Sequence, residues 1–194
     1  QFKVSNANLP YPIHFYTLKN EEIIFEDKKV QVECFRVNHR IECWGFLFSE
    51  KKNTRKIDPK KVMQYNIPSS YFENLQEGGD YISISNETIK NELLTMPGLH
   101  ASSYAYCADT GYFEQIIEKI KDVDLLYHES TYLHTLEEKA SARFHSTSKQ
   151  AATVASKANA KKLLLGHFSS MYDDIEEFKN EACEIFENTE CALE

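Results

Sequence analysis

The chain has 194 residues, of which 42% are hydrophobic and 12% aromatic, so it is long enough for a single domain with a real core and too short to make a second one expected. It holds no apolar run near the roughly 20 residues of a membrane span and no charged-then-apolar leader, and we expect a soluble, cytoplasmic protein. Its net charge of -8 argues against capture of nucleic acid by electrostatics alone, because a phosphate-binding surface normally carries a basic patch.

The cysteines also exclude two classes of small protein. Five of them occur without CxxC or zinc-finger spacing, at Cys34, Cys43, Cys107, Cys183 and Cys191. An odd set of this kind argues against both a disulfide framework and a structural zinc site. We expect reduced thiols.

The first quarter of the chain has the pattern of antiparallel strands. β-Prone runs at residues 22–25 and 30–35 flank four charged residues, which predicts a hairpin. A third run covers residues 43–48 and follows the loop that contains His39. A lone histidine in such a loop is usually just exposed.

Between Lys51 and Leu99 the strand pattern fades, and three prolines and Gly78-Gly79 interrupt it. Only residues 59–65 are typical of a short helix, with proline in the first turn. We therefore predict a single domain over residues 1–194, with a surface insertion at 51–99.

From residue 103 onward the pattern predicts the order β-α-β-α-β-α. Strand-like runs lie at 103–109, 124–129 and 162–167, and an apolar stripe at helical spacing follows each run. The stripes are Phe113, Ile116, Ile117 and Ile120; Ala151, Val154, Ala155 and Ala158; and Ile175, Phe178, Ala182 and Ile185. The second helix has Ser146 or Thr147 as its N-cap, and Asn159 suits a left-handed C′ position at its end.

Polar side chains stand at the ends of the three strand-like runs. These are Asp109, Glu129 and His167. Because the carboxyl ends of strands in an open α/β sheet face a common crevice, these side chains can converge. A carboxylate can bridge two divalent cations and an imidazole can ligate one, so a metal-dependent hydrolytic site is the first hypothesis.

Each of these residues also has a plainer explanation. Taken alone, Asp109 would more often be the N-cap of a helix starting at Tyr112, and His167 a hydrogen-bonded loop histidine. Glu129 can orient a proton-transferring histidine such as His145, although a capping box or a solvated loop also explains either cluster. The concurrence of such residues at equivalent strand ends favours the functional site.

Four segments of the second half keep the order and spacing of one known family. They are SYAYCADT at 103–110, HEST at 128–131, HSTSKQAA at 145–152, and HFSS at 167–170 with Tyr172. A weaker match extends through LPYPI at 9–13 and NHRIECWGF at 38–46. The chain resembles ribonuclease Z, the tRNA 3′-processing endonuclease of the metallo-β-lactamase fold. The resemblance implies the C-terminal part of that α/β sandwich.

The resemblance also implies a role for each site residue. His39 looks like a ligand of one zinc ion, His167 like a ligand of the second, and Asp109 like the carboxylate that bridges both. His145 resembles the histidine that protonates the leaving 3′ oxygen, and Glu129 the acid that orients it. The implied reaction is phosphodiester hydrolysis that removes the 3′ trailer of a tRNA precursor, by a commonly homodimeric enzyme with two zinc ions per subunit.

Three departures from the family pattern modify this expectation. The family's His-x-His-x-Asp-His motif is absent from this sequence, so we expect a fragment that binds zinc weakly and is inactive. Met171 stands where the family usually has arginine, and a thioether cannot clamp a phosphate. The family's glycine- and lysine-rich arm matches residues 75–99, which contain Lys90 as their one lysine.

A basic cluster beside the insertion is the remaining candidate for contact with tRNA phosphates. It comprises Lys51, Lys52, Arg55 and Lys56, followed by Lys60 and Lys61. A solvated surface is the more common meaning of such a run. We predict that Lys51, Lys52, Arg55 and Lys56 bind the substrate.

Two rival hypotheses belong to other classes. The first is a different metallo-β-lactamase-fold hydrolase that acts on a small phosphodiester or ester, and processing of precursor tRNA would separate it from the ribonuclease. The second is a catalytically silent interaction module, whose strand-end residues serve as caps and core hydrogen bonds. Substitution of His145 would cost such a module no turnover.

Overall fold

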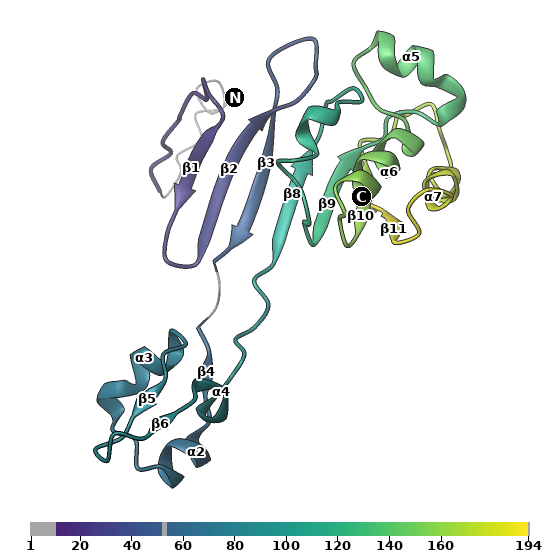
Figure 1. The fold of residues 1–194 in the computed structure, drawn as a ribbon. Helices are drawn as coiled ribbons and strands as arrows, with labels where there is room; N and C mark the ends of the chain where they lie inside the picture. The colour runs from purple at the N-terminus through teal and green to yellow at the C-terminus, as the bar shows by residue number, and fades with distance from the viewer. Residues whose placement is uncertain (1–10, 52–53, 194) are drawn as a thin grey trace.

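The computed structural model describes residues 11–51 and 54–193, and its main feature is a seven-stranded mixed sheet (Figure 1). The strand order is β1-β2-β3-β8-β9-β10-β11. The strands are β1 (Glu22–Glu26), β2 (Val30–Arg36), β3 (Trp44–Glu50), β8 (Ser103–Cys107), β9 (Leu125–Glu129), β10 (Leu163–Gly166) and β11 (Thr189–Cys191). Strands β1, β2, β3 and β8 pair antiparallel, whereas β8 to β11 pair parallel. The predicted α/β class, with an antiparallel region before the parallel strands, is confirmed.

The predicted hairpin at the start of the sheet is confirmed. Asp27 lies in its turn, where one carboxylate oxygen accepts the backbone N–H groups of Lys29 and Val30, each at 2.7 Å. An aspartate that bonds the backbone two and three residues ahead stabilises such a turn locally. The third predicted strand is also present, and β3 pairs with β2 along its whole length.

Helix α6 (Ser148–Lys157) begins and ends as its sequence predicts. Thr147 is the N-cap, and its side chain and that of Gln150 bond each other's backbone N–H in a capping box. At the other end, Asn159 has a φ of 53°, the left-handed conformation expected beyond a helix C-terminus. The strong caps fix where the chain enters the helix, directly after His145.

Two predicted helical stripes differ from the structure. Residues 113–120 form only a 3-10 turn, η2 (Glu114–Ile116), followed by turns, because the chain enters it with Phe113 extended. Ile116 and Ile120 are nevertheless buried, so their spacing came from core packing rather than from a helix. In the third stripe, helix α7 (Glu176–Cys183) ends before Ile185, which is 41% exposed.

The two faces of the sheet have different surroundings. Phe35, Ala105, Leu126 and Leu165 point to the face covered by α6 and α7 and are fully buried in the main core. Their neighbours along the strands point to the other face, which we call the aromatic face. It comprises Phe46, Phe48, Tyr104, Tyr106 and Tyr127. Phe48 stacks on Tyr104 and Tyr106 on Tyr127, while Phe48 and Tyr106 remain 38% and 36% exposed.

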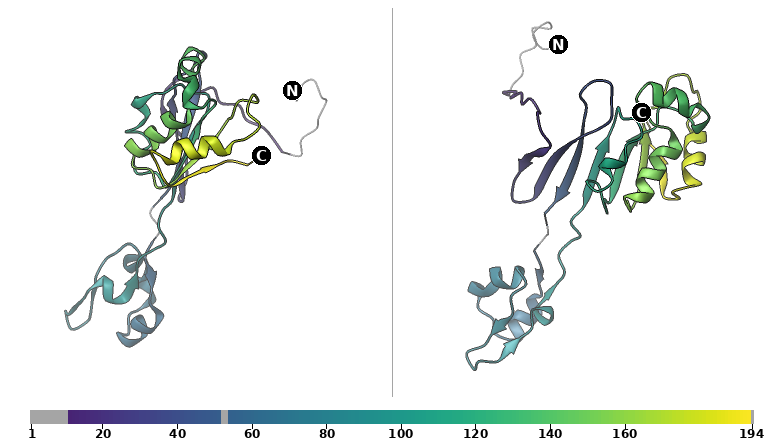
Figure 2. Two further views of the ribbon diagram at one scale, coloured as in Figure 1. Left: turned by 90° about the vertical axis from the view of Figure 1, so that its right-hand side faces the viewer. Right: turned by 45° about the horizontal axis from the view of Figure 1, so that its top comes forward.

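Residues 54–97 form a small unit apart from the sheet (Figures 1 and 2). Its elements are β4 (Lys56–Ile57), α2 (Pro59–Gln64), η1 (Ser69–Tyr71), α3 (Phe72–Gln76), β5 (Tyr81–Ile82), β6 (Thr88–Ile89), α4 (Asn91–Leu94) and β7 (Thr95–Met96). The predicted helix at 59–65 corresponds to α2, with Asp58 as its N-cap. The division into one partial domain with an insertion stays a prediction.

The small unit has its own core. Leu75 and Leu94 are fully buried in it, together with Val62, Ile67, Tyr81 and Ile89. The buried Asn91 donates to the carbonyl oxygens of Leu75 and Gly79, each at 2.8 Å. An amide that satisfies two carbonyls across the unit holds elements too short to be stable alone. Among the described helices, none is long and apolar enough to cross a membrane.

Candidate active site

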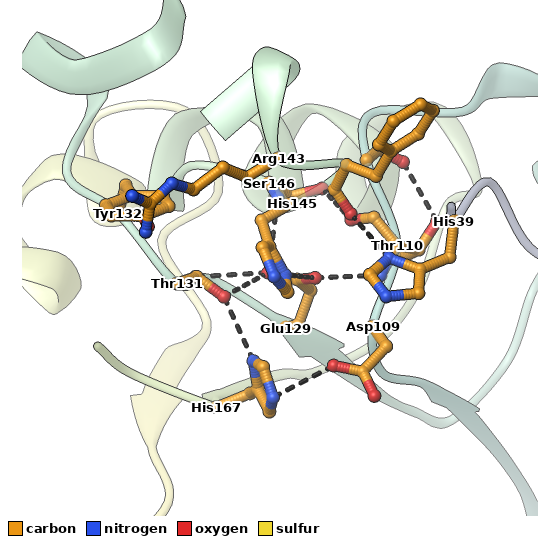
Figure 3. Close-up of polar contacts among 12 residues, drawn as sticks. His39, Asp109, Thr110, Glu129, Thr131, Tyr132, Arg143, His145, Ser146 and His167 are labelled. Carbon is orange, nitrogen blue, oxygen red and sulfur yellow. Dashed lines mark hydrogen bonds and ion pairs between the residues drawn. The ribbon is translucent and has the colours of Figure 1, made fainter. Parts of the chain in front are cut away.

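The three parallel strands β8, β9 and β10 bring the predicted site residues together (Figure 3). Asp109 follows β8, Glu129 closes β9 and His167 follows β10. His145 joins them from the loop before α6, and His39 from the loop between β2 and β3. The convergence expected from strand ends is therefore present for Asp109, Glu129 and His167, and two loop histidines join them.

Glu129 and His145 form a tight dyad. Nδ1 of His145 donates to Oε1 of Glu129 at 2.7 Å. The glutamate side chain is completely buried and the histidine side chain is 18% exposed. The hydrogen bond that His145 donates to the Glu129 carboxylate raises the pKa of His145, although burial opposes it. A histidine held toward its protonated form, with one edge open, can act as a general acid.

The buried Glu129 carboxylate is surrounded by donors. Besides His145, it accepts the backbone N–H of Thr110 at 2.7 Å, of Ser146 at 3.1 Å and of Thr131 at 3.2 Å. The hydroxyl of Thr131 donates a further bond at 2.6 Å. Burial alone would raise the pKa of Glu129, but these bonds, led by His145, outweigh it and the pKa is lowered. With its oxygens occupied, Glu129 orients His145 and is not available as a metal ligand.

Asp109 and His167 form the second pair of the site. Oδ1 of Asp109 lies 2.9 Å from Nε2 of His167, and both side chains are partly exposed. The plainer explanation for Asp109 does not hold, because the described backbone around Tyr112 is irregular rather than helical. A carboxylate facing an imidazole nitrogen in an open site is a typical pair of metal ligands.

Each of the three histidines has its Nδ1 held by an acceptor. His39 Nδ1 lies 3.1 Å from the carbonyl oxygen of Phe144, His145 bonds Glu129, and His167 Nδ1 lies 3.0 Å from the hydroxyl oxygen of Thr131. For His39 and His167, an acceptor at Nδ1 favours a proton there and leaves Nε2 for a metal ion, whereas His145 carries a proton on Nε2 when it acts as an acid. Metal-ligating histidines are usually fixed in this way.

Three residues of the site have a left-handed backbone. Asp109, Phe144 and His167 have φ values of 51°, 60° and 59°. Bulky residues rarely adopt the left-handed region, and such strain concentrates at functional sites. At Phe144 the strain turns the carbonyl toward His39, and at His167 it turns the ring toward Asp109.

The donor set of the site fits a divalent cation. Imidazole nitrogens of His39 and His167 and the carboxylate of Asp109 are ligands that zinc takes. The candidate ligand atoms of Asp109, Glu129, His145 and His167 lie within 4.8 Å of one another, and His39 is outside this group. The ring of His145 stacks on that of His167 with centroids 5.4 Å apart. Its bond to Glu129 gives it a different task. The group therefore suits metal binding beside a proton donor.

The basic cluster lies elsewhere. Lys51 is at the opposite end of β3 from the His39 loop and pairs with Glu26 at 2.8 Å. Arg55 donates to Thr95 inside the small unit, and Lys56 is exposed on β4. Lys52 lies outside the described residues. None of these three described cations reaches the site at the carboxyl ends of β8, β9 and β10.

Two other cations flank the site and were missed by sequence reasoning. The ammonium of Lys139 lies 5.0 Å above the ring of Tyr132 and 3.7 Å from the sulfur of Met171, and Arg143 donates to the Tyr132 hydroxyl at 3.2 Å. Tyr132 in turn contacts His145 edge-on. The signal was available, because Lys139 and Arg143 are four residues apart, just before His145, and share one side of a helical turn.

A pocket of about 690 Å³ opens on the other side of His145. Tyr112, Phe144, Gln150 and Asn38 contribute to its wall. Its volume is in the range of small-ligand sites, so a nucleotide-sized group can lie next to the proton donor.

Comparison with known proteins gives a consistent result. A β-lactamase superfamily domain model matches residues 93–168. The chain is 39% identical over 188 residues to a ribonuclease Z of Bacteroides thetaiotaomicron and 43% identical over 192 residues to one of Cytophaga hutchinsonii. These matches cover 96% and 97% of this chain but only 60% and 61% of the relatives, so the chain spans about three fifths of their length.

Solved structures agree on the fold. A metallo-β-lactamase fold protein of Bacillus subtilis matches 88% of this chain and 49% of its own, with a TM-score of 0.56 and 15% identity. The short form of human tRNase Z matches 89% of this chain and 44% of its own, with a TM-score of 0.51 and 20% identity. The predicted metallo-β-lactamase fold is therefore confirmed.

Proposed function

Because this chain is homologous to ribonuclease Z and has part of the metallo-β-lactamase fold, we propose that the protein containing it is a zinc-dependent endoribonuclease. It removes 3′ trailers from tRNA precursors by hydrolysis of a phosphodiester. It acts in the cytoplasm as a homodimer, which sedimentation of the intact protein would test.

His145 is the proton donor in this proposal. Its Nε2 edge faces the open site, while Nδ1 is held by Glu129 at 2.7 Å. Protonated His145 gives its proton to the departing 3′ oxygen of the tRNA, so the products are a tRNA with a 3′-hydroxyl and a trailer with a 5′-phosphate. Glu129 remains ionised, keeps the imidazole oriented and stabilises its charge.

His39, Asp109 and His167 would hold zinc in this proposal. When bound, zinc lowers the pKa of an attacking water and offsets the charge that develops on the phosphate. The protein supplies the orientation. Nδ1 of His39 contacts the carbonyl oxygen of Phe144 and Nδ1 of His167 contacts the hydroxyl of Thr131, which leaves Nε2 of each ring for the metal.

Substrate contact falls to two groups of cations. Lys139 and Arg143 lie next to the site and suit phosphates near the scissile bond, whereas Lys51, Arg55 and Lys56 lie where the small unit joins the sheet. Lys52 belongs to the second group by sequence. We assign these distant cations to the body of the tRNA.

One observation carries the proposal. Both oxygens of the Glu129 carboxylate accept hydrogen bonds, and this carboxylate lies beside Asp109 and His167, which are typical metal ligands. A carboxylate with a purely structural role would not need to bond a partly exposed histidine such as His145. A simple metal-binding site would not need a buried glutamate that orients a neighbouring histidine. Their combination supports hydrolysis with protonation of a poor leaving group. The alternative of a silent interaction module does not explain it.

The test is His145→Ala in the intact protein, assayed on a precursor tRNA. Loss of general acid catalysis is expected to lower kcat by about 10²–10⁴-fold. On bis(p-nitrophenyl) phosphate, whose leaving group departs without protonation, the same variant is expected to lose far less. The kcat values on the two substrates are compared with those of His14→Ala, which removes an exposed histidine.

The alternatives give other results. Wild-type hydrolysis of the small diester without cleavage of precursor tRNA would indicate a different hydrolase of this fold. Equal losses on both substrates would contradict the role of His145 as proton donor. Unchanged turnover in His145→Ala would contradict the catalytic site itself.

A further inference from the structure

Thr110 lies in the loop that follows β8 and takes part in several hydrogen bonds of the site (Figure 3). Its backbone N–H donates to Oε1 of Glu129 at 2.7 Å, and its carbonyl oxygen accepts the hydroxyl of Ser146 at 2.7 Å. Its hydroxyl oxygen accepts the backbone N–H of Asn38 at 3.1 Å and donates to the carbonyl oxygen of Gly111 at 2.9 Å. The residue is completely buried, so bulk water does not replace these partners.

The backbone and the side chain of Thr110 serve different neighbours. Its backbone groups bind Glu129 and Ser146, which belong to the proton-donor half of the site. Its hydroxyl binds the chain at Asn38, the residue before His39. Because a carbonyl oxygen can only accept, the hydroxyl proton goes to the next carbonyl of the chain, and the hydroxyl oxygen is left to accept from Asn38. A substitution of the side chain therefore removes the contact with Asn38 and keeps the backbone groups that bind Glu129 and Ser146.

The contact with Asn38 is one half of a clamp on the His39 loop (residues 37–43). In the other half, the backbone N–H of Gly111 donates to the carbonyl oxygen of Asn38 at 2.8 Å. Within the described chain these loop residues form neither a helix nor a strand, so the position of the loop depends on contacts with its surroundings. Asn38 precedes His39, and Gly111 lies shortly after Asp109. The clamp thus sets the position of His39 relative to Asp109.

We propose that Thr110 is a positioning residue whose hydroxyl holds the His39 loop in register with Asp109. One buried residue then fixes both halves of the site, because its backbone braces the dyad of Glu129 and His145 while its hydroxyl anchors the loop that carries His39. The anchoring of the loop stands on these contacts alone. Its consequence for zinc rests on the proposed function, in which His39 and Asp109 are ligands.

The first test measures the loop in the metal-free intact protein. Hydrogen–deuterium exchange is resolved to single amides by mass spectrometry with electron-transfer fragmentation. In Thr110→Val, which keeps the shape and lacks the hydroxyl, the Asn38 amide is expected to exchange about 2–10-fold faster, the factor that corresponds to one lost neutral hydrogen bond. The amides of Thr131 and Ser146, which donate to Glu129, are expected to keep their wild-type rates. Thr110→Ser keeps the hydroxyl and is expected to protect the Asn38 amide as the wild type does.

The second test measures the zinc affinity of the intact protein by competition with a chromogenic chelator. Thr110→Val is expected to bind zinc about 2–10-fold more weakly, because the conformation that presents His39 to the metal must be selected from a looser loop. Thr110→Ser is expected to match the wild type. Thr153→Val is the matched control, because it removes a hydroxyl that donates to a backbone carbonyl within α6.

Three results would overturn the proposal. They are wild-type exchange of the Asn38 amide in Thr110→Val, equal acceleration of the Asn38, Thr131 and Ser146 amides, and equal zinc affinity in Thr110→Val and wild type. If the valine variant does not fold, the wild-type protein still decides, because an Asn38 amide that exchanges at the rate of an unstructured peptide would show that the clamp does not form. A wild-type protein that leaves precursor tRNA uncut, while exchange and zinc affinity follow the expectation, would count against the ribonuclease function and support the anchoring role of Thr110.

Discussion

At the scale of single residues, the site depends on partners that are themselves not reactive. Phe144 and Thr131 each hold one histidine by Nδ1, and the backbone N–H groups of Thr110 and Ser146 help to keep Glu129 ionised. A left-handed backbone at Phe144 costs about 1–3 kcal/mol, which the surrounding contacts must offset. The geometry of the histidines is therefore set by their neighbours.

The ammonium group of Lys139 lies beside Met171. The resemblance implies an arginine at position 171, and here the ammonium of Lys139 lies 3.7 Å from the methionine sulfur. We predict that Lys139→Ala raises KM for precursor tRNA several-fold with little change in kcat, because one phosphate contact is lost. The slope of log KM against log salt should fall by about 1.

A matched control and a rescue sharpen this prediction. Lys179 lies on α7, away from the site, and its ammonium pairs with Glu190 on β11. Lys179→Ala should therefore leave KM unchanged. Adding Met171→Arg to Lys139→Ala should restore binding, since the arginine returns a cation to the same place. If Lys139→Ala binds precursor tRNA like the wild type at every salt concentration, another group holds the phosphate.

At the scale of elements, the strand ends were the informative part of the sequence. Runs such as Leu163–Gly166 are apolar and short, and their polar end residues converge because parallel strands share one edge. The apolar spacing from Phe113 to Ile120 predicted a helix that is not present. Ile116 and Ile120 are buried in and just after a 3-10 turn, and their spacing is also the one that a helix would have. The contacts of Thr131 were not predictable, since a hydroxyl has no periodic pattern.

Most of the small unit could not be predicted from the sequence either. Strands such as Tyr81–Ile82 have two residues, too few for an alternating pattern to be recognised. Their stability comes from Asn91 and the buried leucines, which are distant in sequence. Only α2, with Pro59 at its start and Asp58 as its cap, had a local signal.

Asp124 ties together the amino ends of three strands. It precedes β9, accepts from the backbone and hydroxyl of Ser103 at the start of β8, and pairs with Lys161 before β10 and with His100. The hydrogen bond from Lys161 is the main reason that the pKa of Asp124 is well below its usual range; burial opposes it and is outweighed. The charged form is thus stabilised by folding.

The sign of the pH effect follows from this lowered pKa. A carboxyl with a lower pKa in the folded state adds stability above its unfolded pKa of about 4 and loses it as the pH falls below that value. We predict that Asp124→Asn lowers the free energy of unfolding by about 1–3 kcal/mol at pH 7. The difference from the wild type should shrink below about pH 4, as measured by urea unfolding from pH 3 to pH 8.

A variant of a nearby surface carboxylate provides the comparison. Glu190→Gln removes an exposed carboxylate that pairs with Lys179 and should leave the free energy of unfolding almost unchanged. Two results would contradict this prediction: Asp124→Asn has the same free energy of unfolding as the wild type at pH 7, or its loss of stability is the same at pH 3 as at pH 7. Either would show that the contacts of Asp124 with Ser103 and Lys161 do not stabilise the fold as the geometry indicates.

At the scale of the whole molecule, the sheet has one covered and one open face. The helices bury Phe35 and Leu126 on one side, whereas Phe48 and Tyr106 of the aromatic face are more than a third exposed. Apolar surfaces of this kind are normally covered by association. The chain spans about three fifths of its curated relatives, and the metal ligands it provides are correspondingly few.

The last prediction concerns metal binding by a polypeptide of these 194 residues alone. His39, Asp109 and His167 give each of two zinc ions about two protein ligands, against the three or four that stable sites have. Glu129 cannot make up the number, because its oxygens accept bonds from His145, Thr131 and backbone N–H groups. We therefore expect weak zinc binding and no cleavage of precursor tRNA.

Equilibrium dialysis followed by metal analysis gives the measurement. The 194-residue polypeptide should retain well under two equivalents of zinc at micromolar free metal, and Asp109→Asn should retain still less, because the shared carboxylate is lost. His14→Ala should match the unaltered polypeptide, since that histidine is exposed and distant in sequence from the site. Tight binding of two equivalents would show that these three ligands suffice, and the weak-site argument would then be wrong.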